Sequence, residues 1–293
     1  MLRLAALVPL GALALAPRPA LAGSEETRAA GAPQITAECK AKLAADYGPL
    51  GKGRDIVRRL YPQFDPSTFL VKAGPPHALL DCDFLLRRKP VTSLAVVLQF
   101  PSAKTIAGKE GSSDSGGFYD DEFRFEIADL RGDSLDEASV ARNPNALTRE
   151  TLDGETDRTP LPLGGPVRLD RTAFPLSESE SAVAVRFDVE TTADGYGAYL
   201  SEYDELALFR PDGPNLTLIL MVPLKLVTTQ VHCDDDPDCG GSDENKYVVR
   251  VAKHKTGGLY DLVVKNISHP RKQRPVTYQW NGKTYVPAAP GKK

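Results

Sequence analysis

The chain is poor in the residues from which many ligand and cofactor sites are built. Its 293 residues include one Trp, two Met, four Cys and four His. It contains no Gly-rich phosphate loop, no His-Glu-x-x-His and no Cys-x-x-Cys, the short motifs of nucleotide, zinc-protease and thiol-redox sites. These absences argue against the enzyme classes that carry such motifs. A single Trp also gives little support to an aromatic ligand pocket.

Neither sign of charge dominates the sequence. Lys and Arg number 36 against 39 Asp and Glu, which gives a net charge of −3 at pH 7. A weakly acidic balance argues against nucleic acid and anionic membrane surfaces as partners. Beyond the N-terminal segment, no apolar run approaches the roughly 20 residues that a spanning helix needs. We therefore expect no nucleic-acid partner and no membrane span in the mature chain.

The first residues have the order of a secretory signal peptide. Arg3 supplies a positive start, residues 4–16 are apolar apart from one Pro and one Gly, and a breaker at 17–19 precedes Ala20-Leu21-Ala22. This order predicts cleavage after Ala22, with a retained membrane anchor as the alternative. The mature chain would then be periplasmic or secreted. It would carry a net charge of −5, because two arginines are removed.

The body that follows is long enough to bury its own core without help from metal or disulfides. Residues 23–35 are small and polar, which is typical of disorder, and residues 131–166 are acidic, with prolines and no clear period. The expected segments are a signal peptide at 1–22, a disordered linker at 23–35, an N-terminal helix-plus-β half at 36–130, a long loop or boundary at 131–166, a C-terminal β-meander half at 167–287 and a tail at 288–293. Whether the two halves form one domain stays open.

The mature chain has four cysteines, Cys39, Cys82, Cys233 and Cys239. An even count after a signal peptide indicates two disulfides in an oxidising compartment. Three pairings are possible. Proximity favours Cys233–Cys239, and this leaves Cys39–Cys82 to tie an N-terminal helix to the first strand. A zinc site is the rival interpretation, but the paired Cys-x2-Cys spacing is missing.

Helical signals are confined to the N-terminal part. Thr36 can cap a helix over residues 35–46, which places Cys39 and Leu43 on one side, and a second short helix is expected at 53–61. Beyond it, strand-like patterns dominate, often with apolar residues at alternate positions. The expected strands are 78–86, 92–100, 122–130, 182–189, 205–209, 216–222, 247–251, 259–264 and 276–280.

Two turns connect these strands by recognisable chemistry. Residues 210–215 combine Pro, Asp, Gly and Asn, which is typical of a turn. Asn281-Gly282 predicts a two-residue hairpin turn, whose register pairs Tyr278 with Tyr285 and Trp280 with Lys283. Short strands and tight turns predict a mostly β fold. We expect an antiparallel meander that forms a sandwich or open barrel, with one or two short N-terminal helices.

Part of this meander resembles a blade of the integrin-type (FG-GAP-like) repeat. The resemblance rests on residues 256–264, Thr-Gly-Gly-Leu-Tyr-Asp-Leu-Val-Val, which match at Gly258, Asp261, Leu262, Val263 and Val264, and on the aromatic hairpin Tyr278-Gln279-Trp280-Asn281-Gly282 with Tyr285. Roughly residues 180–287 are also similar to the tail of uncharacterised secreted bacterial proteins. The resemblance implies β architecture. The calcium ligands of the family precede the glycine, where this chain has Lys253, His254 and Lys255, so that site should be absent.

A second calcium pattern lies in an acidic loop. Asp234, Asp236 and Asp238 fall at alternate positions, as the first ligands of an EF-hand loop do, but Cys239 replaces the required glycine. A loop closed by Cys233–Cys239 could still gather these three residues and Asp243 around calcium. The alternative is a solvated acidic loop, whose charges water screens. No other cofactor is expected.

The tetrapeptide Gly132-Asp133-Ser134-Leu135 resembles the motif of GDSL-type esterases, in which Ser is the nucleophile. That chemistry needs a His oriented by an Asp, which the family supplies as Asp-x-x-His. The residues three before the four histidines are Gly74, Thr229, Val251 and Asn266. The pattern therefore favours a chance tetrapeptide in a loop over catalysis by Ser134.

The aromatic residues Tyr278, Trp280 and Tyr285 are expected on one face of the last hairpin. If exposed, this strip could bind sugar rings or a partner protein; otherwise it covers the core. The sequence as a whole predicts a non-enzymatic binding or structural protein, with an envelope protein or carbohydrate as partner. The alternatives are a secreted hydrolase that uses Ser134 and a calcium-stabilised structural module.

Overall fold

The computed structural model describes residues 35–71, 77–89, 92–101, 123–146, 167–193, 199–230, 242–271 and 273–289. The predicted signal peptide, the linker and the tail fall almost wholly outside these ranges. The described residues build two short α-helices, one 3-10 turn and fifteen strands. Neither helix among them is long and apolar enough to cross a membrane.

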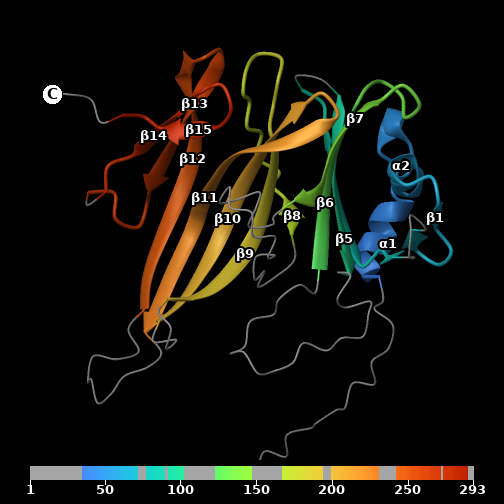
Figure 1. Ribbon diagram of the computed structural model, residues 1–293, viewed down its shortest axis with the longest axis horizontal. Coiled ribbons are helices and arrows are strands. Elements are labelled where there is room, and N and C mark those ends of the chain that lie inside the picture. Colours follow the sequence, from blue (N-terminus) through green and yellow to red (C-terminus); the bar gives the residue numbers. More distant parts are fainter. Residues whose placement is uncertain are drawn as a thin grey trace, which may run out of the picture. The chain divides into compact units, whose positions relative to one another are not determined.

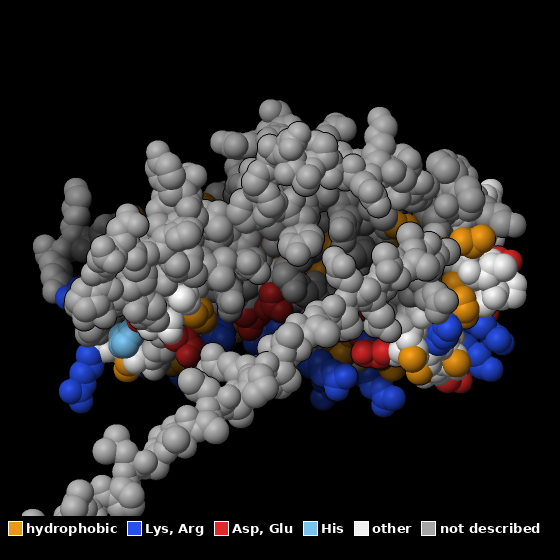
Figure 2. Space-filling model, turned by 90° about the horizontal axis from the view of Figure 1, so that it is seen from below, with side chains coloured by type: hydrophobic (Ala, Val, Ile, Leu, Met, Phe, Trp, Pro, Cys, Tyr) orange, Lys and Arg blue, Asp and Glu red, His pale blue; other side chains and the backbone are white. Residues whose placement is uncertain are grey.

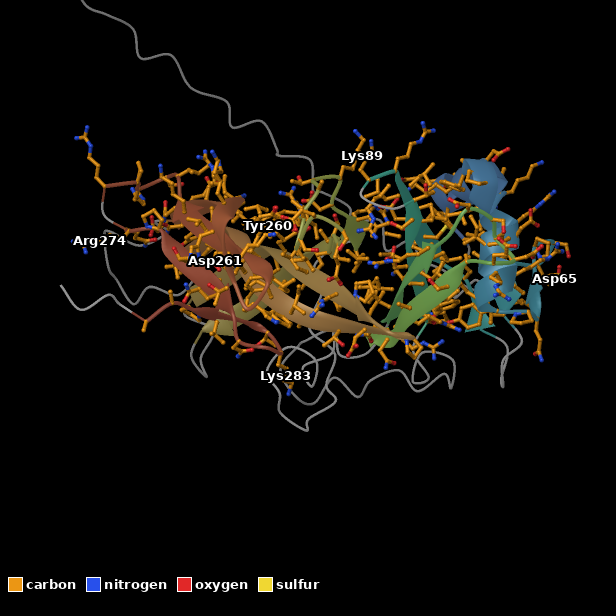
Figure 3. All side chains as sticks on the ribbon, turned by 90° about the horizontal axis from the view of Figure 1, so that it is seen from above. Asp65, Lys89, Tyr260, Asp261, Arg274 and Lys283 are labelled. Carbon is orange, nitrogen blue, oxygen red and sulfur yellow. A yellow bond between two sulfur atoms is a disulfide. The ribbon has the colours of Figure 1, made fainter. Side chains whose placement is uncertain are left out.

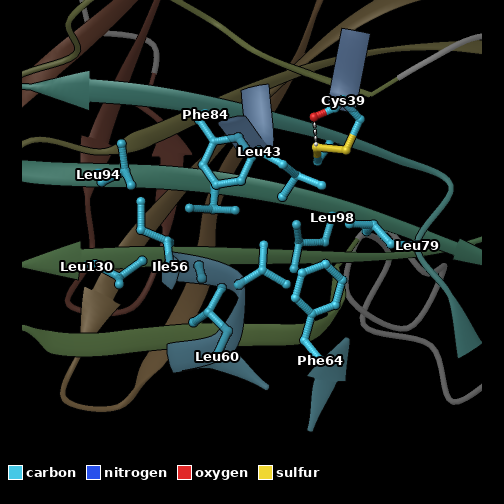
Figure 4. Packing of buried hydrophobic residues seen from close by; sticks show 14 of the residues in the cluster. Cys39, Leu43, Ile56, Leu60, Phe64, Leu79, Phe84, Leu94, Leu98 and Leu130 are labelled. Carbon is cyan, nitrogen blue, oxygen red and sulfur yellow. Dashed lines mark hydrogen bonds between the residues drawn. A yellow bond between two sulfur atoms is a disulfide. The ribbon is translucent and has the colours of Figure 1, made fainter. Parts of the chain in front are cut away.

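The two helices form where the sequence predicts them. Helix α1 spans Ala37–Ala44 and α2 spans Gly53–Leu60, with a 3-10 turn, η1, at Gly48–Leu50 between them. A Cβ on Gly53 would lie 2.4 Å from the carbonyl oxygen of Lys42, so only glycine permits this approach of α2 to α1. The apolar residues of both helices pack with Phe64 and Phe84 into one buried cluster (Figure 4).

Thr36 joins α1 to the sheet through its side chain. Its hydroxyl accepts a hydrogen bond from the Cys39 backbone N–H at 3.1 Å and donates one to Asp81 at 2.7 Å. We expect Thr36→Ala to lower the free energy of unfolding by about 1 to 2 kcal/mol, because it removes the cap and one donor to a buried carboxylate. Urea unfolding checks this. Thr36→Ser keeps both bonds and should stay near the wild type; an equal loss there would contradict the capping explanation.

The N-terminal half contains a four-stranded antiparallel arrangement in the order β4-β5-β6-β7. The strands are β4 (Asp81–Arg87), β5 (Ser93–Pro101), β6 (Phe123–Arg131) and β7 (Ser139–Ala146). A small separate sheet combines β1 (Phe64–Asp65), β2 (Leu70–Val71) and β3 (His77–Ala78). Nearly every residue of β5 is buried, because helices cover one face of the strand and later strands cover the other.

The expected long loop at 131–166 is wrong for its first part, where β7 forms. This strand was missed because it reads Ser-Val-Ala-Arg-Asn-Pro-Asn-Ala, with little alternation. Its polar side chains are satisfied by neighbouring strands: Arg142 binds Glu126 at 2.6 Å, and the Asn143 amide donates to the carbonyl of Leu216. Residues 147–166 lie outside the described ranges.

The second half is built from longer strands. They are β8 (Arg168–Leu169), β9 (Val183–Ala193), β10 (Tyr199–Asp212) and β11 (Asn215–Gln230). Gly213 and Pro214 make the turn between β10 and β11, within the predicted turn region 210–215, whose other residues belong to the strands. A single parallel bridge from Arg142 to Asn215 joins β7 to β11, so both halves share one twelve-stranded sheet system.

Three apolar clusters stabilise this arrangement. The first lies under the helices, and the second packs β5–β7 against β8–β11, with Val97, Ile127, Val185 and Phe209 among its members. The third lies between β9–β11 and the C-terminal strands. The result is a sandwich-like antiparallel fold, one of the two predicted alternatives, rather than a closed barrel, and the helices cover the far side of β4–β7 (Figure 1). The second cluster combines residues of both halves in one core.

The C-terminal strands continue the same sheet system. They are β12 (Ser242–Thr256), β13 (Leu259–Asn266), β14 (Val276–Trp280) and β15 (Tyr285–Pro287). Residues 242–246 of β12 pair with β11, and its remainder pairs with β13. The face that carries Leu262 and Val264 is buried in the third cluster. We call the opposite face of β12–β14 the outer face.

The predicted register of the last hairpin is wrong. Trp280 pairs with Tyr285 and Tyr278 pairs with Pro287, because the loop has four residues, Asn281 to Thr284, instead of two. The Asn281 side chain accepts hydrogen bonds from the backbone N–H groups of Lys283 and Thr284, at 2.9 and 2.8 Å. This side-chain turn widens the loop to four residues. The Asn-Gly pair alone does not predict this wider loop.

Candidate functional site

Ser134 does not assemble a catalytic centre with the described residues. It follows the buried strand β6 in a short loop, where its hydroxyl accepts a hydrogen bond of 3.4 Å from the Glu137 backbone N–H. The two histidines whose side chains are described, His254 and His269, contact Asp261 and Asp243 instead. The side chains of His77 and His232 lie outside the described part of the chain.

Only some of the predicted cysteine and calcium-site residues are among the residues that the structure describes. Cys39 and Cys82 form a disulfide with their Cα atoms 5.0 Å apart, as one of the three possible pairings predicts. Asp243 is exposed in β12, where it accepts a hydrogen bond from the Asn245 side chain. Cys233, Cys239, Asp234, Asp236 and Asp238 lie outside the described ranges, so the second disulfide and the calcium loop remain predictions.

The three aromatic residues of the last hairpin share a face, but that face is the buried one. Trp280 and Tyr285 are 9% and 5% exposed and pack edge to face, with their ring centroids 5.6 Å apart. Tyr278 is half-buried against the same cluster. The Arg210 guanidinium lies 5.2 Å from the Trp280 ring. The strip therefore covers the core and is not an exposed binding surface.

The C-terminal strands carry a charge imbalance that the net charge of the chain hides. Residues 245–289 contain nine Lys or Arg and one acidic residue, Asp261, whereas the preceding residues 233–244 contain six acidic residues and no Lys or Arg. The net charge of the whole chain is a sum over these acidic and basic segments. It therefore says little about what the C-terminal strands attract.

Six of these cations have no acidic partner among the residues that the structure describes. They are Arg250, Lys253, Lys265, Arg271, Arg274 and Lys283. All are exposed except Lys265, which is half-buried. We call these six residues the basic surface. In Figure 2 a histidine at one end of the visible face has both basic and acidic side chains near it, and Figure 3 shows Arg274 and Lys283 at separate places on the C-terminal strands.

Other arginines of the fold form ion pairs with carboxylates, although Arg59, Arg88, Arg124 and Arg171 form none with the described residues. Arg87 binds the buried Asp129 at 2.5 Å, Arg168 binds Asp81 at 2.7 Å, and Arg210 binds Glu180 through two nitrogens. These pairs hold strands and loops together, since an unpaired charge at such depth would be costly. These paired arginines therefore have a structural role. The six cations of the basic surface form no such ion pairs with the described residues.

Strand register places two of these cations close together on the outer face. Arg250 is opposite Val263, and Lys265 is opposite Val248, which makes the two cations diagonal neighbours. Such positions are about 7 to 8 Å apart between Cα atoms, within reach of long side chains. Like charges at this spacing repel each other. Asp261 is the other diagonal neighbour of Arg250, but it bonds His254 and Gln279 and forms no ion pair with either cation. An external anion would relieve the repulsion.

A histidine–carboxylate pair lies on the same strands. His254 bulges from β12 and bonds the buried Asp261 of β13 through Nδ1 at 2.8 Å, while Gln279 of β14 donates to the same carboxylate. Burial alone would raise the pKa of Asp261, but the hydrogen bonds from His254 and Gln279 outweigh it and hold this pKa below its usual value. Asp261 therefore accepts, Nδ1 donates, and Nε2 of the exposed imidazole faces solvent. Sequence reasoning missed this pair because it searched for Asp-x-x-His.

The described residues do not assemble a set of three or more side chains that could hold a metal ion. The chemistry that the outer face offers is hydrogen-bond donation and positive charge, which suits phosphate, sulfate or carboxylate groups. The positive charge of the C-terminal strands could have been found in the sequence by counting charges segment by segment instead of over the whole chain.

Comparison of the chain with protein-family models, with curated proteins and with solved structures finds no match. The resemblance to the integrin-type repeat therefore remains a prediction. The function has to be argued from the surface itself.

Proposed function

We propose that the protein is a non-enzymatic binding protein of the cell envelope or secreted space, and that its C-terminal strands bind an anionic partner. The observation that carries the proposal is the basic surface, in which six cations have no acidic partner among the described residues. The Cys39–Cys82 disulfide supports an oxidising compartment.

The physical argument is that unrelieved like charges cost free energy in the free protein. Arg250 and Lys265 are diagonal neighbours on one face of a sheet, so strand pairing holds the bases of their side chains close together. An anion that bridges them gains charge-assisted hydrogen bonds and removes this repulsion together. Exposed cations also lose little solvation before they bind, which favours rapid, salt-dependent association.

A sulfated polysaccharide, heparin, is a suitable soluble probe of this surface. We expect the wild type to bind labelled heparin at low ionic strength and to release it as salt is added. The double variant Arg250→Glu/Lys265→Glu should weaken binding roughly 30-fold, at about 1 kcal/mol for each cation lost. Fluorescence anisotropy titrations at several salt concentrations measure both effects.

The matched control reverses two cations elsewhere. Arg54 and Arg58 lie on α2 with about half of each side chain exposed, and Arg54→Glu/Arg58→Glu changes the net charge by the same amount. This variant should keep its affinity. Equal losses in both variants would show that only net charge matters, and no wild-type binding at low salt would refute the proposal.

A further inference from the structure

The pair of His254 and Asp261 lies on the outer face, together with two cations of the basic surface. Asp261 is two residues from Val263 and four from Lys265 along β13, so these three side chains share one face of the strand. Arg250 is opposite Val263, which makes Asp261 its diagonal neighbour, with Cα atoms about 7 to 8 Å apart. The imidazole of His254 bonds Asp261, and this bond places it on the face that carries Arg250 and Lys265.

The carboxylate of Asp261 fixes which nitrogen of the imidazole carries the hydrogen. Asp261 is buried, but the hydrogen bonds that it accepts keep its pKa below the usual value, so it is ionised from about pH 5 to about pH 8. An ionised carboxylate only accepts hydrogen bonds, and Nδ1 of His254 therefore donates to it, at 2.8 Å. In the neutral imidazole Nε2 then has a bare lone pair, whereas in the protonated imidazole Nε2 carries a hydrogen.

The Nε2 atom of His254 is open to an external ligand. The side chain is 73% exposed, and Nε2 forms no hydrogen bond with the described residues. A lone pair at this atom repels the oxygen atoms of an anion, whereas a protonated imidazole donates a charge-assisted hydrogen bond to them. Protonation also balances the negative charge of Asp261, which the neutral imidazole leaves uncompensated. Both changes favour an anion when His254 gains its proton.

The groups around this pair differ from it in their titration. They are Arg250, Lys253 and Lys255 on β12, Tyr260 on β13, Tyr285 on β15 and the nearby Glu178, while β14 contributes the uncharged Gln279. The contact between Lys255 and Glu178 raises the pKa of the lysine and lowers that of the glutamate. Burial raises the pKa of Tyr285 to about 12. Among these kinds of side chain, imidazole is the one that ordinarily changes its charge between pH 5 and 8.

We propose that His254 is an anion-binding residue of the outer face and that protonation of its imidazole controls the affinity of this face for the anionic partner. In weakly acidic solution Nε2 donates to an anion that Arg250 and Lys265 also contact. Above neutral pH the face loses this donor and regains the negative charge of Asp261, so the partner is held less tightly. This inference rests on the proposed function and specifies how binding is regulated.

Heparin titrations of the full chain near pH 5.5 and near pH 8 test the inference, because the sulfate groups of this probe are charged at both values. The wild type should bind roughly tenfold more tightly near pH 5.5, as one charge-assisted hydrogen bond of about 1.5 kcal/mol gives. His254→Gln should lose most of this difference, through weaker binding near pH 5.5. His254→Lys has a permanent charge and should bind tightly at both values.

The matched control is His269→Gln, because His269 is 39% exposed and contacts a different carboxylate, Asp243. This variant should keep the wild-type ratio of affinities, and an unchanged thermal midpoint shows that each variant is folded. Burial raises the pKa of Glu205 to about 7, so Glu205 titrates in the same range. It is present in every variant, however, and its effect cancels in the comparison.

The outcomes separate this inference from the proposed function. If the affinity of the wild type does not change with pH, the inference is overturned and the proposed function stands. The same holds if His254→Gln keeps the wild-type ratio, or if His269→Gln loses it equally. If heparin binds at neither pH, both fail.

Discussion

Replacing both bonded cysteines by alanine, Cys39→Ala/Cys82→Ala, should lower the free energy of unfolding by about 4 kcal/mol. The bond closes a loop with a sequence separation of 43 residues, for which the loss of unfolded-state entropy is of this order. Helix α1 has only eight residues, too few to be stable without tertiary contacts. The disulfide and the Thr36 hydroxyl are both links that fix it to β4.

Urea unfolding of the double variant measures this loss directly. Alanine is the right replacement because both positions are buried in the first apolar cluster, where a serine hydroxyl would add a cost of its own. Thermal unfolding of the wild type with and without reductant provides a second estimate. A loss below about 1 kcal/mol would mean that the unfolded chain is already restricted near these residues.

Replacing Glu205 by glutamine should stabilise the protein at alkaline pH by up to about 3 kcal/mol. Glu205 is 9% exposed and has no hydrogen bond or ion pair with any described residue. Burial raises its pKa to about 7, with a further contribution from the charge of Asp204. A carboxyl whose pKa is higher in the folded state favours folding when protonated. The free energy of unfolding therefore falls as pH rises from about 4.5 through about 7.

The variant cannot ionise, so its advantage should be absent near pH 4 and complete near pH 8. Chemical unfolding of both proteins across this range checks the pH dependence. Glu137→Gln, at an exposed position, is the control and should show no such dependence. An advantage for Glu205→Gln that stays constant with pH would rule out titration of Glu205 as its cause.

The burial of Glu205 has a local origin in strand pairing. Glu205 pairs with Phe187 on β9 and with Pro223 on β11, and the register of β10 against β11 shifts between Asp204 and Glu205. Proline has no N–H for the ladder, so a bulge at this point is expected. Glu205 follows the inward-facing alternation of Ala207 and Phe209. Its carboxyl group therefore lies in an apolar environment.

Strands with regular alternation were predictable from the sequence. Apolar and mostly polar residues alternate in the sequences of β6 and β9, and the structure contains both strands near the expected bounds, although residues 125–130 of β6 are buried on both faces. Strand β7 was not predictable in the same way. Its Arg and Asn side chains are satisfied by Glu126 and by the Leu216 carbonyl, partners far away in the sequence. A local pattern contains no information about such partners.

The basic surface was likewise only partly predictable from the sequence. The excess of Lys and Arg after residue 245 can be counted in the sequence, but whether each cation is paired cannot. Lys255 is paired with Glu178, far away along the chain, whereas Arg250 and Lys265 have no described partner. Likewise, the aromatic strip of the last hairpin was correctly placed on one face. Only packing against the third cluster decides that this face is buried.

The sequence by itself determined the β-rich class, the two short helices, most strand positions and the turn at Gly213. These depend on local periodicity, capping and turn chemistry, which act over a few residues. The tertiary structure decided that Cys39 bonds Cys82, that both halves share a core, that the last hairpin has a four-residue loop and that Arg250 and Lys265 have no acidic partner among the described residues. These depend on contacts between distant segments, whose free energies are set only when the chain is folded.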